Sequence, residues 1–265
     1  MKHIRTIIDK EWAEVFKNRT VLLAMLLMPL LFTALPLVML SVTGSTGMEG
    51  VSAESAGLPA AFVKLTCQGV NAGDCMQMYL VNEFLILFML LPIMIPITIS
   101  AYSIVGEKTT RSLEPLLATP VTTVELLAGK CLAAAIPAIL ATSLSFGIFN
   151  LGLVILKISP AVRAYIAGPT WILGILVLGP ILSVIAVIFS LFVSARVSDP
   201  RVAEQLSTVI IIPLMLLLFA QLAGLVVVSV LFMSITIVVC LAIAFGMLHL
   251  GTLIFDRENI LTRWK

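Results

Sequence analysis

The chain has 265 residues, of which 60% are hydrophobic and 11% are charged, and its mean hydropathy is +1.16. A soluble domain is usually about 45–50% apolar and about 25% charged, so a soluble protein of this composition would leave large apolar patches exposed. The net charge is only +2, and no basic run interleaved with aromatic residues indicates nucleic-acid binding. The composition therefore predicts that lipid surrounds most of the chain.

The amphipathic segment 1–19 is expected to form a helix that lies along the membrane surface. Apolar residues such as Ile4, Ile8 and Trp12 recur at helical spacing, while basic residues flank them. Two interpretations remain open for this segment. It anchors the first span, or it forms an elbow that also contacts a cytoplasmic partner.

Long uncharged stretches predict six membrane-spanning helices in an all-α, polytopic membrane protein, because one span needs about 20 apolar residues. The stretch 205–255 contains no Asp, Glu, Lys or Arg and would form a helix of roughly 76 Å, so it must fold back. The turn is expected near Gln221 to Gly224. The predicted spans of this single transmembrane domain, 1–265, are about 21–43, 83–105, 130–156, 168–194, 206–222 and 228–254.

The distribution of Lys and Arg predicts the orientation of these spans. With six spans, 13 of the 16 Lys and Arg residues fall on the side that holds both termini. Only Lys64, Lys157 and Arg163 fall on the other side. Because basic residues favour the cytoplasmic side, both termini are predicted to be cytoplasmic.

The segment 44–82 is predicted to be the one sizeable outer loop, and it contains Cys67 and Cys75. In an oxidising compartment these two residues are candidates for a disulfide, and two free thiols in a mobile loop are the alternative. Cys131 and Cys240 lie within predicted spans and are interpreted as small core residues. No metal site is predicted, since the four cysteines show no paired spacing.

The loop 106–130, between the second and third spans, combines charges, Pro and Thr between two apolar stretches. A short helix carrying Leu113, Leu116 and Leu117 is expected there, ended by Pro120. Thr122 or Thr123 is then expected to cap the helix that enters the third span, with Glu125 in its first turn. A short cytoplasmic helix with an apolar face has nothing of its own to pack against, so it is predicted to fit a cleft on another protein.

The sequence GEKTTRSLEPLLATPVTTVELLAGK of this loop resembles the loop typical of type-2 ATP-binding-cassette (ABC) transporter permeases, of the kind that exports drugs or sodium. The amphipathic N-terminus, SARVSDPRVAEQL (194–206) and FDRENILTRWK (255–265) are also similar to these permeases. The resemblance implies that 106–130 is a cytoplasmic coupling loop that contacts the ATPase. The residues carried over to this coupling region are Glu107, Leu113, Glu114, Leu117, Pro120 and Glu125. Glu107 and Glu114 are then expected to pair either with basic residues on the ATPase or with Arg111 in cis. The spacing alone would equally fit a solvated loop face.

The resemblance further implies a permease subunit of an exporter in the prokaryotic plasma (inner) membrane. Such a subunit forms the translocation pathway as a homodimer, or as a heterodimer with a second permease. It works with a separate ABC-type ATPase subunit that binds ATP and Mg²⁺. The chain itself contains no GxxxxGK[ST] segment, so no cofactor and no enzymatic activity are expected of it.

Polar side chains within the spans are mild, and the residues proposed to line a pathway are Thr98, Tyr102, Ser145 and Asn150. Charged residues are expected only at span edges, with Glu83 at the outer edge of the second span. The absence of a charge at mid-depth disfavours a proton-coupled transporter. An ATP-independent secondary transporter or channel remains the alternative function.

Overall fold

The computed structural model describes residues 2–17, 19–44, 58–109 and 122–254, and all regular structure within these ranges is helical. Six helical segments in them are long and apolar enough to cross a membrane. Their bounds are Val21–Thr43, Ala72–Ala101, Val124–Ile155, Pro160–Arg196, Pro200–Leu222 and Val230–Gly251. The prediction of an all-α, polytopic membrane protein with six spans is thereby confirmed.

Several spans are assembled from more than one helix. The elements in chain order are α1 (Lys2–Lys17), α2 (Arg19–Gly44), α3 (Ala60–Thr66), α4 (Ala72–Phe88), α5 (Leu91–Thr109), α7 (Thr123–Ile155), α8 (Pro160–Ile166), α9 (Pro169–Ile172), a π-helical segment Leu173–Leu178, α10 (Gly179–Arg196), α11 (Pro200–Ser207), a 3-10 segment Thr208–Ile211, α12 (Ile212–Leu222) and α13 (Val230–Ile254). The second span thus joins α4 to α5, and the fourth joins α8, α9, the π-helical segment and α10.

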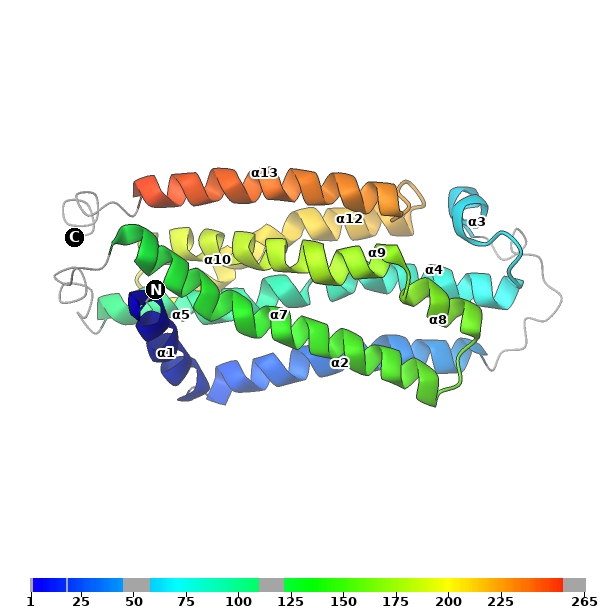
Figure 1. Ribbon diagram of the computed structural model, residues 1–265, viewed down its shortest axis with the longest axis horizontal. Coiled ribbons are helices and arrows are strands. Elements are labelled where there is room, and N and C mark those ends of the chain that lie inside the picture. Colours follow the sequence, from blue (N-terminus) through cyan, green and yellow to red (C-terminus); the bar gives the residue numbers. More distant parts are fainter. Residues whose placement is uncertain (1, 18, 45–57, 110–121, 255–265) are drawn as a thin grey trace.

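The spans run roughly parallel to the long axis, so the bundle has two ends (Figure 1). One end holds α1, the end of α5 and the start of α7, and is called the α1 end below. The other holds α3, the start of α4 and α8, and is called the disulfide end. Helix α1 lies at an angle to the bundle and packs against the start of α7 (Figure 1).

Two expected loops are partly helical in the structure. The second span begins at Ala72 rather than near residue 83, and α3 lies within the segment 44–82, so much of that segment is not loop. Gln77, Asn82 and Glu83 of α4 are buried in the fold, which hydropathy alone does not reveal. At the other end, α5 continues to Thr109 and α7 begins at Thr123, so the loop 106–130 is shorter than expected.

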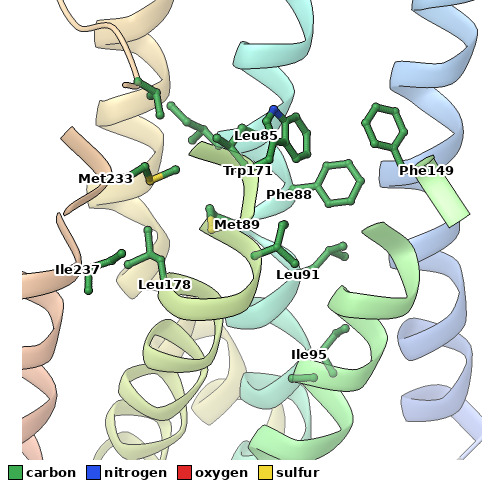
Figure 2. Packing of buried hydrophobic residues seen from close by; sticks show 14 of the residues in the cluster. Leu85, Phe88, Met89, Leu91, Ile95, Phe149, Trp171, Leu178, Met233 and Ile237 are labelled. Atoms are coloured by element: carbon green, nitrogen blue, oxygen red, sulfur yellow. The ribbon is translucent and has the colours of Figure 1, made fainter. Parts of the chain in front are cut away.

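An aromatic cluster forms the centre of the core near the start of the fourth span (Figure 2). Trp171 is fully buried, and its ring lies 5.6 Å from that of Phe88 and 5.7 Å from that of Phe149. The π-helical segment follows directly, and its Gly174 lets Leu85 of α4 and Met233 of α13 approach closely. The core therefore joins α4, α7, α9 and α13 into one packed unit.

Candidate functional site

The predicted coupling loop lies between two helices that the structure describes, α5 and α7. Glu107 belongs to the last turn of α5, and Glu125 belongs to the first turn of α7. The remaining predicted coupling residues, Arg111, Leu113, Glu114, Leu117 and Pro120, lie outside the described residues. The site can therefore be built from the helices on either side of the loop.

A capping box fixes the start of α7. The backbone N–H of Thr122 donates to Glu125 Oε2 at 3.1 Å, and the backbone N–H of Glu125 donates to Thr122 Oγ1 at 3.3 Å. The expectation that Thr122 or Thr123 caps this helix is confirmed for Thr122. Because these bonds satisfy N–H groups that the first turn would leave free, they define where the loop ends and the helix begins.

A buried ion pair joins α1 to α7 directly below that capping box. Lys130 Nζ lies 2.8 Å from Glu11 Oε1 and donates a second hydrogen bond to Ser103 Oγ of α5 at 2.6 Å. The side chains of Lys130 and Glu11 are 4% and 5% exposed. The ammonium group of Lys130, on α7, therefore contacts both α1 and α5, so this one side chain joins the three helices.

A hydrogen bond from Trp12 also holds α1 against α7. Trp12 Nε1 donates to the backbone carbonyl of Ala133 at 2.9 Å. In an uninterrupted helix that carbonyl would accept from residue 137, but residue 137 is Pro, which has no N–H. Trp12 thus supplies the hydrogen bond that Pro137 removes from α7.

Close backbone approach completes the contact between α1 and α7. A Cβ atom added at Gly129 would lie 2.9 Å from Cγ2 of Ile7, which is closer than real contacts allow. Gly129, Lys130 and Ala133 lie on one face of α7, because residues three to four positions apart are neighbours on a helix. We call the contacts made by Ile7, Glu11 and Trp12 with this face the elbow clasp.

The electrostatics of the elbow clasp favour the ionised form of Glu11. Burial alone would raise the pKa of Glu11, but the charge of Lys130, together with hydrogen bonds involving Lys130 and Ser103, lowers it below its ordinary value of 4.5. The carboxylate therefore stays charged and paired at neutral pH. We expect this buried pair to favour one arrangement of α1 and α7, because displacing either helix would leave a buried charge without its partner.

Sequence reasoning missed the elbow clasp. The predicted loop 106–130 ends at Lys130, whereas the structure places Lys130 inside α7 and away from solvent. Glu11 carried a signal that could have been used: it stands four residues after Ile7 and four before Val15, on the apolar side of α1. A carboxylate on that side needs a buried partner.

Three of the four residues proposed to line a pathway make hydrogen bonds within the described part of the chain. Thr98 donates to Glu204 Oε1 of α11 at 2.9 Å, and this joins the second span to the fifth. Ser145 and Asn150 of α7 donate to carbonyls of their own helix, at 2.7 Å and 2.8 Å. The side chain of Tyr102 lies outside the described residues. The role of all four residues in transport stays a prediction.

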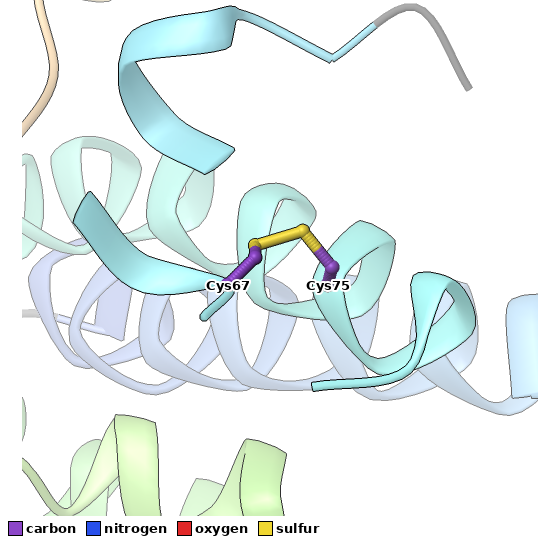
Figure 3. The surroundings of a disulfide bond; sticks show 2 residues. All are labelled: Cys67 and Cys75. Carbon is purple, nitrogen blue, oxygen red and sulfur yellow. A yellow bond between two sulfur atoms is a disulfide. The ribbon is translucent and has the colours of Figure 1, made fainter. Parts of the chain in front are cut away.

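The disulfide end contains a disulfide bond and, further along α4, a buried carboxylate. Cys67 and Cys75 form a disulfide, with Cα atoms 5.4 Å apart, which ties α3 to the first turn of α4 (Figure 3). On α4, Glu83 is buried, with 8% of its surface exposed, well inside the span that begins at Ala72. This corrects the expectation that Glu83 lies at the outer edge of the second span, an error that follows from placing the start of that span too late.

Comparison with protein families finds a match over nearly the whole chain. The family model described as "ABC-2 family transporter protein" matches residues 5–260, which is nearly the whole chain. A search of curated proteins finds no match. The family model agrees with the six apolar spans, and it describes a membrane component rather than the ATPase of such a transporter. The chain therefore belongs to the ABC-2 family, as a multi-pass membrane permease component of an ABC transporter.

Proposed function

We propose that this permease is an exporter subunit that receives the work of ATP hydrolysis from a separate ATPase subunit through residues 106–130. The observation that carries the proposal is the elbow clasp, in which Lys130 holds α1, α5 and α7 together at the base of the loop. Displacement of the loop would move all three elements as one body. Buried, fully paired contacts transmit such rigid-body shifts better than flexible ones.

The cycle that we propose begins with two ATPase subunits closing on ATP and Mg²⁺ below the α1 end. The loop follows them and carries α5 and α7, with α1 attached. Since α5 and α7 both belong to spans, the shift changes how the spans pack and opens the pathway to the opposite side. The sequence contains no GxxxxGK[ST] segment, which supports a separate subunit as the site of hydrolysis.

We further propose that the α1 end is cytoplasmic and that the protein resides in a prokaryotic inner membrane. The strong bias of Lys and Arg toward the side of the termini supports this orientation. A disulfide between Cys67 and Cys75 at the opposite end agrees with it, because disulfides persist in oxidising compartments outside the cytoplasm. Six spans are few for enclosing a pathway, so the working unit would be a homodimer or a heterodimer with a second permease.

Co-purification and transport assays test this proposal. An ATPase subunit with a P-loop should co-purify with the tagged permease and should hydrolyse ATP faster in its presence. Glu107→Ala and Glu114→Ala should lower that stimulation at least tenfold, while Glu49→Ala, in the outer segment, should leave it unchanged. The proposal fails if no ATPase subunit associates and the loop variants transport normally.

The direction of transport requires a separate measurement. Inside-out vesicles that contain both subunits should accumulate cargo only when ATP is added outside them. Accumulation by right-side-out vesicles would indicate import and would overturn the exporter assignment while leaving the coupling mechanism in place.

An ATP-independent transporter is the second candidate, and one observation favours it. Glu83 is a buried carboxylate within a span, and such groups mark ion or proton pathways. Proteoliposomes that contain the permease alone discriminate the two functions. Cargo movement driven by an ion gradient, without ATPase subunit or ATP, would favour this second candidate.

A further inference from the structure

A group of polar side chains is buried between α4 and α12 near the disulfide end. Glu83 of α4 lies against Tyr79, one turn earlier on the same helix, and against Gln221, in the last turn of α12. Glu83 is 8% exposed and Gln221 is 2% exposed. These residues come from two different spans, so the cluster is a product of the fold and not of local sequence.

Four side-chain polar atoms of this cluster, on Glu83 and Gln221, lack a hydrogen bond of ordinary geometry. Both carboxylate oxygens of Glu83 are buried and complete no hydrogen bond of ordinary geometry, and the same holds for the amide oxygen and nitrogen of Gln221. A buried polar group left in this state destabilises the fold, and a charged group does so more strongly. Such atoms in a native fold call for an explanation, and a bound ligand that supplies their missing hydrogen bonds or charge contacts is one.

The chemistry of the cluster indicates what that ligand is. A carboxylate, an amide oxygen and a phenol oxygen offer oxygen atoms, which suit a cation. In the part of the chain that the structure describes, no Lys, Arg or His forms an ion pair with Glu83. One carboxylate balances one positive charge, and the described residues contain no group of three or more His, Cys, Asp or Glu that could hold a metal ion. A monovalent cation therefore fits better than a divalent one.

The cluster is covered from the disulfide end by α3. Phe62 of α3 is 1% exposed, and its ring packs edge-on against Tyr79 with the centroids 5.3 Å apart. Pro59, at the start of α3, lies close to Gly224 in the turn that follows α12. The disulfide ties the far end of α3 to α4 (Figure 3). The tether leaves α3 attached to the protein even if Phe62 moves away from Tyr79.

We infer that Glu83, Tyr79 and Gln221 form a binding site for a monovalent cation, either an alkali metal ion or the protonated amine of an amphipathic cargo, beneath the cover formed by α3. The site deepens the proposed function. It rests on that function in one respect, namely that the bound cation is cargo or a co-transported ion. Its position near the disulfide end would place it on the exit side of an exporter.

Binding to the full chain in lipid nanodiscs tests this site without the ATPase subunit. The unfolding temperature would be measured during titration with Na⁺ or with phenethylammonium, at constant ionic strength maintained with choline. A ligand that binds only the folded state raises that temperature in a saturable way. Wild-type protein should respond to at least one of the two ions, and the responding ion identifies the source of the charge.

The variants make the result specific for Glu83. Glu83→Gln preserves shape but removes the charge, and it should weaken half-saturation at least tenfold. Asp74→Asn is the matched control, since it makes the same chemical change on the same helix, where Asp74 accepts from Ser159 at 2.8 Å. Asp74→Asn should bind as wild type does. If Glu83→Gln does not fold, Gln221→Leu retains the carboxylate and should still weaken binding.

Two outcomes would overturn the inference. One is a wild-type protein whose unfolding temperature responds to neither ion, which would make Glu83 a neutral carboxylic acid buried for packing. The other is a response that Glu83→Gln retains in full. Neither outcome affects the coupling experiments with Glu107 and Glu114, so failure of the site and failure of the exporter assignment are distinguishable.

Discussion

Replacing Lys130 by Met removes the ammonium group from the elbow clasp and leaves the Glu11 carboxylate buried without its partner. Loss of one partner from a buried ion pair usually costs 3–5 kcal/mol, and the 2.8 Å contact and the 4% and 5% exposures place this pair in that class. The expected result is a destabilisation of about 3 kcal/mol or more. Stimulation of the ATPase by the permease should fall with it, because α1, α5 and α7 no longer move together.

The double variant Glu11→Leu/Lys130→Met separates the cost of an unpaired charge from the loss of packing. Replacing both partners of a buried pair by apolar residues is often neutral or stabilising, so the double variant should recover most of the lost stability. It should not recover the ATPase stimulation if the specific geometry of the pair positions the loop. Thermal or denaturant unfolding in detergent and ATPase assays in proteoliposomes provide the two readouts.

The exposed pair of Lys10 and Glu14 on α1 supplies a matched control. Their charged atoms lie 3.8 Å apart and the side chains are 37% and 61% exposed, so Lys10→Met should cost about 0–1 kcal/mol. A Lys130→Met protein as stable and as well coupled as Lys10→Met would refute the reasoning. A double variant no more stable than Lys130→Met would show that the loss is one of packing.

Three other perturbations test features of the two ends. Gly129→Val should displace α1 and lower the unfolding temperature, whereas Gly147→Val, where an added Cβ meets nothing within 4 Å, should not; equal unfolding temperatures would contradict the close packing. Acidification should release α1, because the pKa of Glu11 is lowered in the folded protein. The ionised carboxylate then stabilises the fold fully above about pH 4.5, and this contribution is lost as the pH falls through the folded-state pKa. Protease sensitivity of α1 that does not change below pH 4.5 would argue against this. Replacing Cys67 and Cys75 by Ser should cost roughly 2–3 kcal/mol by the chain-entropy estimate and should expose α3 to proteolysis; unchanged cleavage of α3 would show that its packing suffices without the disulfide.

The spans could be predicted from the sequence because lipid-facing helices need long uncharged stretches, and those stretches are visible locally. The start of α4 could not be, because Asp74, Asn82 and Glu83 resemble loop residues until the helices that cover them are known. The elbow clasp is harder still. Glu11 and Lys130 stand 119 positions apart, and the sequence around either residue does not indicate that the other is its partner.

Part of the clasp was nevertheless within reach of sequence reasoning. Trp12 was placed on the apolar side of the first helix, and Pro137 within a span implies a carbonyl that some neighbour must satisfy. The spacing could not reveal that Trp12 supplies the hydrogen bond that Pro137 removes, since that depends on how α1 crosses α7. Hydrophobic periodicity predicts which face of a helix is buried, and it leaves open what lies against that face.

The hydrogen bond from Trp12 to Ala133 makes the docking of α1 and the shape of α7 a single linked equilibrium. If α1 leaves, the Ala133 carbonyl loses the hydrogen bond from Trp12 and must find water or bend α7 at Pro137, since an unsatisfied carbonyl in a lipid environment costs several kcal/mol. Linkage is reciprocal, so whatever bends α7 at Pro137 weakens the hold on α1 by the same free energy. A change at Pro137, near the middle of the third span, can in this way alter the docking of α1 at the end of the bundle without any change in the loop 106–130.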